Sequence, residues 1–176
     1  MESKFELRSP ITPYVCSTPS DFEEEREFLS EHVYPELVRL CQSRGTYFQA
    51  VDVQWEVEDT LTQNGFLLSS LLDLIGQTSP YFICLLGETY GPHLDHQPSP
   101  GRKDNSSLSS DSNTWLDKNF NFASETGHAW VKEGDYCRSS IPELEIMAAC
   151  FRGNATQCTF YFRQVSYCPV SNISFQ

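Results

Sequence analysis

Small polar and acidic side chains follow two of the short apolar segments in this chain. In open α/β sheets, ligands bind beyond the carboxyl ends of the strands, where such side chains can exchange hydrogen bonds with a ligand. The resulting ligand-edge candidates are Ser17, Thr18, Asp21, Asp52 and Gln54. The competing interpretation is structural, because residues 17–21 can cap a helix and Asp52 can satisfy backbone donors.

A further carboxylate, Glu145, lies in the first turns of a helix predicted over residues 143–151, and it could point over the same edge. A carboxylate at that place is also ordinary helix-dipole chemistry, and the neighbouring Glu143 competes for any catalytic role. Glu145 is therefore the catalytic candidate, with a structural role as its alternative.

Other kinds of reactive site are missing from the sequence. Neither Gly-x-Gly-x-x-Gly nor Gly-x-x-x-x-Gly-Lys-Ser/Thr occurs, so the 176 residues carry no phosphate-binding loop of their own. His93 and His96, with Asp95 between them, lie in a proline-bounded loop that lacks the supporting hydrogen-bond partners of a metal site. We expect no ATPase activity, no metal site and no bound cofactor.

The composition is acidic, with 12 Lys and Arg residues against 24 Asp and Glu residues and a net charge of −12. Such a surface repels the phosphates of nucleic acids and of anionic membranes. The seven cysteines form no Cys-x-x-Cys pair and several lie in apolar runs, which is typical of reduced, buried thiols. The sequence shows neither the apolar block of a secretory signal nor the run of about 20 apolar residues that spans a membrane. We expect a cytoplasmic protein that binds neither nucleic acid nor membranes.

The elements that would position the candidates alternate between strands and helices. A strand at 14–16 leads into a helix over 22–45, which Ser20 and Glu23 open as a capping box. Pro35 lies inside this helix and should kink it.

The middle of the chain predicts two more strands and one more helix. Residues 47–55 alternate between apolar and polar side chains, as in a strand with one covered face. Asn64 should cap an amphipathic helix over 66–75. Residues 81–86 are continuously apolar, which is typical of a central parallel strand covered on both faces.

From 92 to 138 the sequence is largely polar, and we expect a long disordered insertion there. Ser140 should then cap the last helix, and residues 158–162 should form a fourth strand. This order predicts an α/β fold with a doubly wound parallel sheet of at least four strands, because parallel neighbours need helical returns. The domain would span 14–164, between an N-terminal tail at 1–13 and a divergent C-terminal tail at 165–176.

A resemblance to a known family rests on motifs in ordered succession along the chain. They are Ser17-Thr18 with Asp21, Glu25-Arg26, Leu29 and Val33-Tyr34-Pro35-Glu36-Leu37; Val51-Asp52-Val53-Gln54-Trp55; Pro80-Tyr81-Phe82-Ile83 through Leu86-Gly87 to Tyr90-Gly91; Ser140-Ile141-Pro142-Glu143-Leu144-Glu145-Ile146; and Phe160-Tyr161-Phe162-Arg163. Over 14–163 the chain resembles the TIR-like N-terminal domain, a domain of unknown function, of NACHT-type (STAND) signalling ATPases with WD or tetratricopeptide repeats. Arg26 joins the ligand-edge candidates on this ground.

The resemblance implies a flavodoxin-like, TIR-like fold and a protein-interaction module that binds a protein partner or a second copy of itself. The alternative that it implies is a TIR-like enzyme that cleaves NAD or another nucleotide. Such relatives carry a glutamate early in the third helix, at the place of Glu145. A carboxylate there would stabilise the positive charge that develops on the ribose as the glycosidic bond breaks.

The chain also departs from the family pattern. Pro19 stands in place of phenylalanine, and Gln54 and Thr89 stand where the family often has arginine. The loss of two positive charges from the ligand edge weighs against an anion-binding or nucleotide-binding role. Because no NACHT or repeat region follows, we expect a short, alternatively spliced isoform or a fragment of a longer chain.

Overall fold

The computed structural model describes residues 9–18, 20–78, 80–94, 114–153, 155 and 157–163. These residues build one four-stranded sheet in the order β2-β1-β3-β4, with every neighbouring pair parallel. The strands are β1 (Tyr14–Ser17), β2 (Val51–Asp52), β3 (Tyr81–Leu86) and β4 (Gln157–Phe162). Parallel neighbours cannot be joined by a hairpin, so each connection crosses over through helices.

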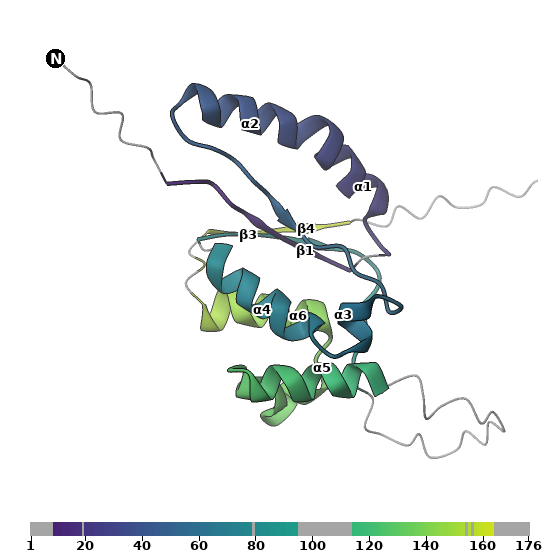
Figure 1. Ribbon diagram of the computed structural model, residues 1–176. Coiled ribbons are helices and arrows are strands. Elements are labelled where there is room, and N and C mark those ends of the chain that lie inside the picture. Colours follow the sequence, from purple (N-terminus) through teal and green to yellow (C-terminus); the bar gives the residue numbers. More distant parts are fainter. Residues whose placement is uncertain are drawn as a thin grey trace, which may run out of the picture.

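Helices cover the sheet from both sides (Figure 1). On one side lie α1 (Glu23–Phe28) and α2 (Tyr34–Ser43). On the other side lie α3 (Thr60–Gln63), α4 (Leu67–Thr78) and α6 (Ile141–Ile146), with α5 (Thr114–Glu125) as an outer layer. The predicted doubly wound α/β fold with a parallel sheet is therefore confirmed. None of the helices in the described ranges is long and apolar enough to cross a membrane.

The helix predicted over 22–45 is divided by a π-helical turn, η1 (Leu29–Val33), between α1 and α2. The backbone N–H of Tyr34 donates to the C=O of Leu29, five residues earlier, which widens the helix at that point. Pro35 follows in the first turn of α2. The wider turn thus lies directly before Pro35, where the kink was expected.

The start of α1 differs from the prediction. The helix begins after Phe22, and no side chain accepts a hydrogen bond at its cap, so the capping box of Ser20 and Glu23 is wrong. Packing fixes the entry to the helix instead, because Phe22 is buried in an apolar cluster with Val15 and Leu85. Tertiary contact therefore takes over the role that local capping was expected to play.

The later helices are capped both by residues close to them in the sequence and by a distant one. Asn64 ends α3 instead of opening α4, so that predicted cap is wrong. The first turn of α4 is capped from α5, where Oδ1 of Asn119 accepts a hydrogen bond from the N–H of Leu68 at 3.1 Å. The predicted cap of α6 is confirmed, because the Ser140 hydroxyl oxygen accepts a hydrogen bond from the Glu143 N–H at 3.3 Å.

The strand predicted over 47–55 is shortened to the two residues of β2, with one isolated parallel bridge between Ile11 and Phe48. The next backbone acceptor, the C=O of Val53, accepts a hydrogen bond from the Arg26 side chain at 3.0 Å. A side chain therefore takes over where the ladder of backbone hydrogen bonds stops. The bridge at Ile11 also draws part of the predicted tail at 1–13 against the sheet.

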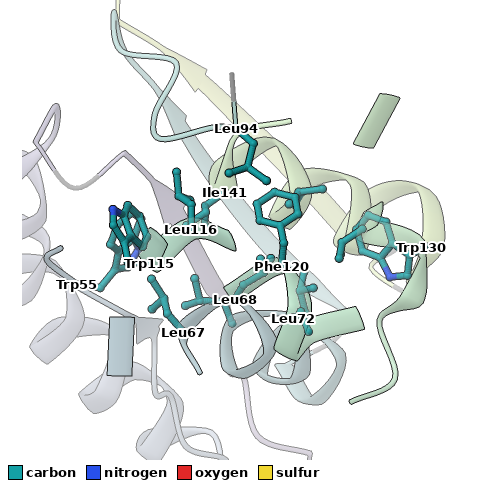
Figure 2. Packing of buried hydrophobic residues seen from close by; sticks show 14 residues of the cluster. Trp55, Leu67, Leu68, Leu72, Leu94, Trp115, Leu116, Phe120, Trp130 and Ile141 are labelled. Atoms are coloured by element: carbon teal, nitrogen blue, oxygen red, sulfur yellow. The ribbon is translucent and has the colours of Figure 1, made fainter. Parts of the chain in front are cut away.

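Residues 114–138, the second part of the predicted insertion, form α5 and two 3-10 helices, η2 (Ala129–Lys132) and η3 (Gly134–Arg138). The prediction of disorder is wrong for these residues, and residues 95–113 lie outside the described ranges. The physical reason is an apolar stripe at helical spacing, formed by the buried side chains of Trp115, Leu116, Phe120 and Ala123. Figure 2 shows Trp115, Leu116 and Phe120 in one cluster with Leu67, Leu68 and Leu72 of α4.

A fully buried amide fixes α5 to its neighbours. The Nδ2 group of Asn119 donates to the C=O groups of Thr62 and Trp115, each at 2.8 Å, while its Oδ1 caps α4. The amide thereby meets the condition for burying a polar side chain, which is that its donors and acceptor find partners. α5 is therefore part of the core.

Candidate functional site

Arg26 gathers two of the ligand-edge candidates at the carboxyl end of the sheet. Its side chain reaches over from α1, and Nη1 donates to the hydroxyl oxygen of Ser17 at 2.8 Å. Nη2 donates to the carboxylate of Asp52 and to the C=O of Val53. The Arg26 side chain is only 2% exposed, so a cation, its counter-ion and a hydroxyl form one buried cluster.

This cluster leaves little for a ligand to bind. A buried cation is tolerated when it is paired and hydrogen-bonded, and Asp52 supplies the pairing charge. Within the described residues, Nε is the one nitrogen of the Arg26 guanidinium without a hydrogen-bond partner. The geometry therefore favours the structural interpretation of Ser17 and Asp52.

Thr18 and Asp21 meet the loop that follows β3. The carboxylate of Asp21 accepts hydrogen bonds from the Thr89 N–H at 2.8 Å and from its hydroxyl at 2.6 Å. The hydroxyl of Thr18 donates to the Thr89 C=O at 3.1 Å. Gly87 passes so close that a Cβ atom there would lie 2.6 Å from the Asp21 carboxylate. Both carboxylate oxygens of Asp21 thus hold two loops together.

Glu145 lies inside the molecule and not over the ligand edge. The residue is 3% exposed. One carboxyl oxygen accepts a hydrogen bond from the Tyr14 hydroxyl, and the other accepts one from the Cys16 thiol at 3.3 Å. Tyr14 and Cys16 are alternate residues of β1, so both side chains point to the face of the sheet that α6 covers.

Burial determines the protonation of this second cluster. Burial raises the pKa of Glu145 to about 7, although hydrogen bonds from Tyr14 and Cys16 and the charge of Arg26 act in the opposite direction. Burial and the charge of Glu145 raise the pKa of Tyr14 well above its usual value. A hydrogen bond with Cys84, together with burial, raises the pKa of Cys16. Near neutral pH the cluster therefore holds a partly protonated carboxyl between side chains that are themselves buried.

The three candidate carboxylates do not converge on one pocket. Asp21, Asp52 and Glu145 are each held by a different protein donor. Gln54 lines a cavity of 490 Å³ at the ligand edge. That cavity is also lined by the cation of Arg26 and by the acidic side chains of Glu23, Glu56 and Asp59. Because the charge of Arg26 is paired with Asp52, the three acidic side chains leave the wall negative, which disfavours a phosphate-bearing ligand.

The part of the chain that the structure describes offers no set of side chains suited to a metal ion. Among those residues, no three His, Cys, Asp or Glu side chains are grouped so that they could hold a metal ion. Asp95 and His96, two of the three residues of the loop considered above, lie outside the described ranges.

An apolar groove of 740 Å³ lies between the α1–α2 layer and strands β1, β3 and β4. Its lining includes Phe22, Phe28, Ile83, Leu85, Tyr161 and Phe162. The two aromatic residues from β4, Tyr161 and Phe162, are 58% and 75% exposed. Contiguous exposed apolar surface of this kind marks interaction sites in soluble proteins.

Two curated relatives match 89% of the chain, at 39% identity in Rattus norvegicus and 40% in Mus musculus. Both are named tetratricopeptide repeat protein 41. The chain is homologous to that protein. The match covers 12% of each relative, so the chain spans about an eighth of the length of tetratricopeptide repeat protein 41.

Shorter matches lead to proteins whose names combine NACHT and WD repeat domains. The chain is 33% identical over 87 residues to NACHT and WD repeat domain-containing protein 2 of Homo sapiens, covering 46% of the chain and 5% of that protein. It is 38% identical over 74 residues to NACHT domain- and WD repeat-containing protein 1 of Mus musculus, covering 39% of the chain and 5% of that protein. No family model matches the chain, and no solved structure gives a significant match.

Sequence reasoning missed the partners that occupy the candidate residues. Thr89, noted only as a departure from a family pattern, supplies both donors to Asp21. The alternation of β1 places Tyr14 and Cys16 on one face, which was a usable signal. No local pattern shows that Glu145 lies opposite that face, because the contact joins residues 131 positions apart.

Replacing Arg26 should strongly destabilise the fold. Arg26→Met leaves the largely buried charge of Asp52 uncompensated, and removal of one partner of a buried pair costs about 3–5 kcal/mol. Urea unfolding measures the loss. Arg163→Met is the matched control, because it removes an exposed pair with Glu25 and should cost less than about 1 kcal/mol. Equal losses in the two variants would contradict the role assigned to Arg26.

Glu145 should make the protein less stable as the pH rises toward neutrality. Between about pH 4.5 and 7 the folded protein keeps a proton that the unfolded chain has released, so the free energy of unfolding falls as pH rises through this range and then levels off. Chemical denaturation measures the free energy of unfolding at about pH 5 and at about pH 8. Between these two pH values it should fall on the order of 3 kcal/mol further in the wild type than in Glu145→Gln. Parallel pH profiles of the two proteins would show that the pKa is not raised.

Proposed function

We propose that this chain is a TIR-like protein-interaction domain of a NACHT-type (STAND) repeat protein, that it works in the cytoplasm, and that it binds a second copy of itself. The homology to tetratricopeptide repeat protein 41 and the shorter matches to NACHT and WD repeat proteins support this class. The 176 residues carry no phosphate-binding loop, so ATP hydrolysis would belong to another part of such a protein.

The observation that carries the proposal is the enclosed position of Glu145. A catalytic carboxylate must reach its substrate, but this one is 3% exposed and both of its oxygens are engaged by Tyr14 and Cys16. The ligand-edge candidates other than Gln54 are likewise hydrogen-bonded within the protein; they are Ser17, Thr18, Asp21, Arg26 and Asp52. A fold whose candidate polar groups serve its own stability is suited to recognition through its surface.

The outer edge of β4 is the surface best suited to self-association. Among the described strands β4 pairs only with β3, so its outer row of backbone groups has no strand partner there. Its residues, Gln157–Phe162, include no charge and no proline, the two features that most often block pairing at an edge. Two copies related by a twofold axis can therefore pair their β4 strands in antiparallel fashion.

Charge favours this surface over others on the molecule. Each copy has a net charge of −12, so most approaches of one copy to another are repulsive. Pairing at β4 brings uncharged residues together and covers Tyr161 and Phe162 beside the apolar groove. Added salt should strengthen this association, because it screens the overall repulsion while the contact itself contains no ion pair.

Wild-type protein should shift from monomer to dimer as its concentration rises, and Tyr161→Lys should prevent the shift. Lysine on an edge strand opposes pairing because its charge would have to be desolvated. Sedimentation velocity over a wide concentration range, at low and at moderate salt, measures the equilibrium.

Tyr47→Lys is the matched control for this experiment. Tyr47 is 50% exposed against 58% for Tyr161, but it lies away from β4, so dimerisation should be unchanged. A wild type that stays monomeric at every concentration would overturn self-association. Equal dimerisation of all three proteins would keep self-association and reject β4 as its surface. If the chain stays monomeric but binds a different protein stably, its role as an interaction domain stands and a second copy is not its partner.

One observation favours the alternative function, cleavage of NAD or another nucleotide. Glu145 is a buried carboxyl whose pKa is raised to about 7, and perturbed pKa values of this kind cluster at catalytic sites. Structural clusters shift pKa values in the same way, however, and the contacts with Tyr14 and Cys16 are of that kind.

The wild-type protein should therefore leave NAD and ATP intact, even at high protein concentration and after long incubation. The physical reason is that no substrate atom can reach the carboxyl of Glu145 without opening the contact between β1 and α6. Chromatography of the nucleotides measures the outcome, with Glu145→Gln as the control. Product that forms with the wild type and is absent with Glu145→Gln would reject the interaction-only proposal.

A further inference from the structure

Two free thiols face each other beside the edge strand. Cys150 belongs to the π-helical turn η4 (Met147–Arg152), which continues α6, and Cys158 belongs to β4. Their sulfur atoms are 3.2 Å apart, with the Cys150 thiol donating a hydrogen bond to the Cys158 sulfur. Both side chains are half-buried, so small solutes can approach them.

The other described cysteines are placed differently. Cys16 and Cys84 lie in the same apolar cluster but are buried at 1% and 0% exposure. Cys41 is also buried, and the thiol of Cys137 donates to the C=O of Gly134 at 3.2 Å. Cys150 and Cys158 therefore combine a close sulfur contact with access from solvent.

We propose that Cys150 and Cys158 form an oxidation site that reacts with hydrogen peroxide and closes to a disulfide. The inference concerns the chemistry of these two residues and goes beyond the proposed interaction role. A disulfide requires a sulfur separation of about 2.05 Å, so the two atoms need to approach by about 1 Å. Small rotations of two half-buried side chains can supply that movement.

The hydrogen bond between the two thiols sets the order of the steps. Burial and the contact with Cys158 raise the pKa of Cys150 to about 12, so Cys150 keeps its proton and donates it to the neighbouring sulfur. The Cys158 sulfur accepts this hydrogen bond, and its own thiol donates to the C=O of Ala155 at 3.5 Å. Because the Cys158 sulfur is the acceptor of the pair, we assign it the first reaction with peroxide.

The reaction is balanced with hydrogen peroxide as the only oxidant. The Cys158 sulfur, having released its proton to solvent, attacks one peroxide oxygen; an S–O bond forms, the O–O bond breaks and hydroxide leaves with the electron pair. The Cys150 sulfur then attacks the resulting sulfenic acid; the S–S bond forms, the S–O bond breaks and the Cys150 proton leaves with the oxygen as water. In total, two thiols are oxidised and one peroxide is reduced to two waters.

The bond would change how an exposed edge strand, β4, is held. β4 is at an edge and its residues are mostly exposed, with β3 as its strand partner. A covalent link from Cys158 to η4 would tie this strand to the helical layer as well. In a reducing compartment such a bond is transient, as expected for a thiol pair that responds to oxidant.

The sequence allows a direct test by peptide mapping. Arg138, Arg152 and Arg163 place the two cysteines on separate tryptic peptides, 139–152 and 153–163, with one cysteine in each. Reduced full-length protein is treated with hydrogen peroxide, its remaining thiols are alkylated under denaturing conditions, and it is digested without reduction. We expect peptides 139–152 and 153–163 to appear as one cross-linked species, which dithiothreitol separates.

Three serine variants make the test specific. Cys137→Ser, a half-buried cysteine outside the pair, should leave the cross-link unchanged, whereas Cys150→Ser and Cys158→Ser should abolish it. With dimedone present, Cys150→Ser should trap a sulfenic acid on Cys158, a readout that does not depend on the disulfide. Absence of the cross-link in the wild type, or a cross-link from either peptide to another cysteine, would overturn the proposal.

Discussion

One buried guanidinium holds the β2 side of the sheet together. β2 has two residues and a single strand neighbour, too little to secure an edge by backbone hydrogen bonds alone. Arg26 supplies what is missing by binding Ser17 of β1, Asp52 of β2 and the C=O of Val53 at once. Because a buried cation must be paired, the position of α1, the end of β2 and the ion pair with Asp52 constrain one another.

The other candidate carboxylates are also engaged in contacts within the protein. Asp21 is engaged by Thr89, Asp52 by Arg26 and Glu145 by Tyr14 and Cys16, so each carboxylate that could serve a ligand already has a structural partner. Buried polar groups whose hydrogen bonds are all made within the protein add specificity to a fold but have no free donor or acceptor for a substrate. Large apolar side chains, in contrast, remain uncovered on the surface.

The sequence was sufficient where a local pattern decides the structure. Strands β1, β3 and β4, the cap at Ser140 and the parallel doubly wound order all follow from apolar runs, turn residues and the need for crossovers. It was insufficient where a distant residue decides. Asn119 caps α4 from 51 positions away, and Arg26 ends β2 from another layer. The apolar stripe of α5 is visible in the sequence, but it was not predicted, because the segment 92–138 is largely polar when it is taken as a whole.

The apolar groove follows from topology rather than from any single residue. Crossovers between parallel strands are right-handed, so a helix lies on one face when the chain moves along the sheet in one direction and on the opposite face when it moves back. The chain steps from β1 to β2 in one direction, then from β2 to β3 and from β3 to β4 in the other. The first connection places α1 and α2 on one face, and the two later ones place α4 and α6 on the other (Figure 1). No described connection therefore covers the β3–β4 half on the α1 side, and Ile83, Leu85 and Tyr161 line the groove that is left there.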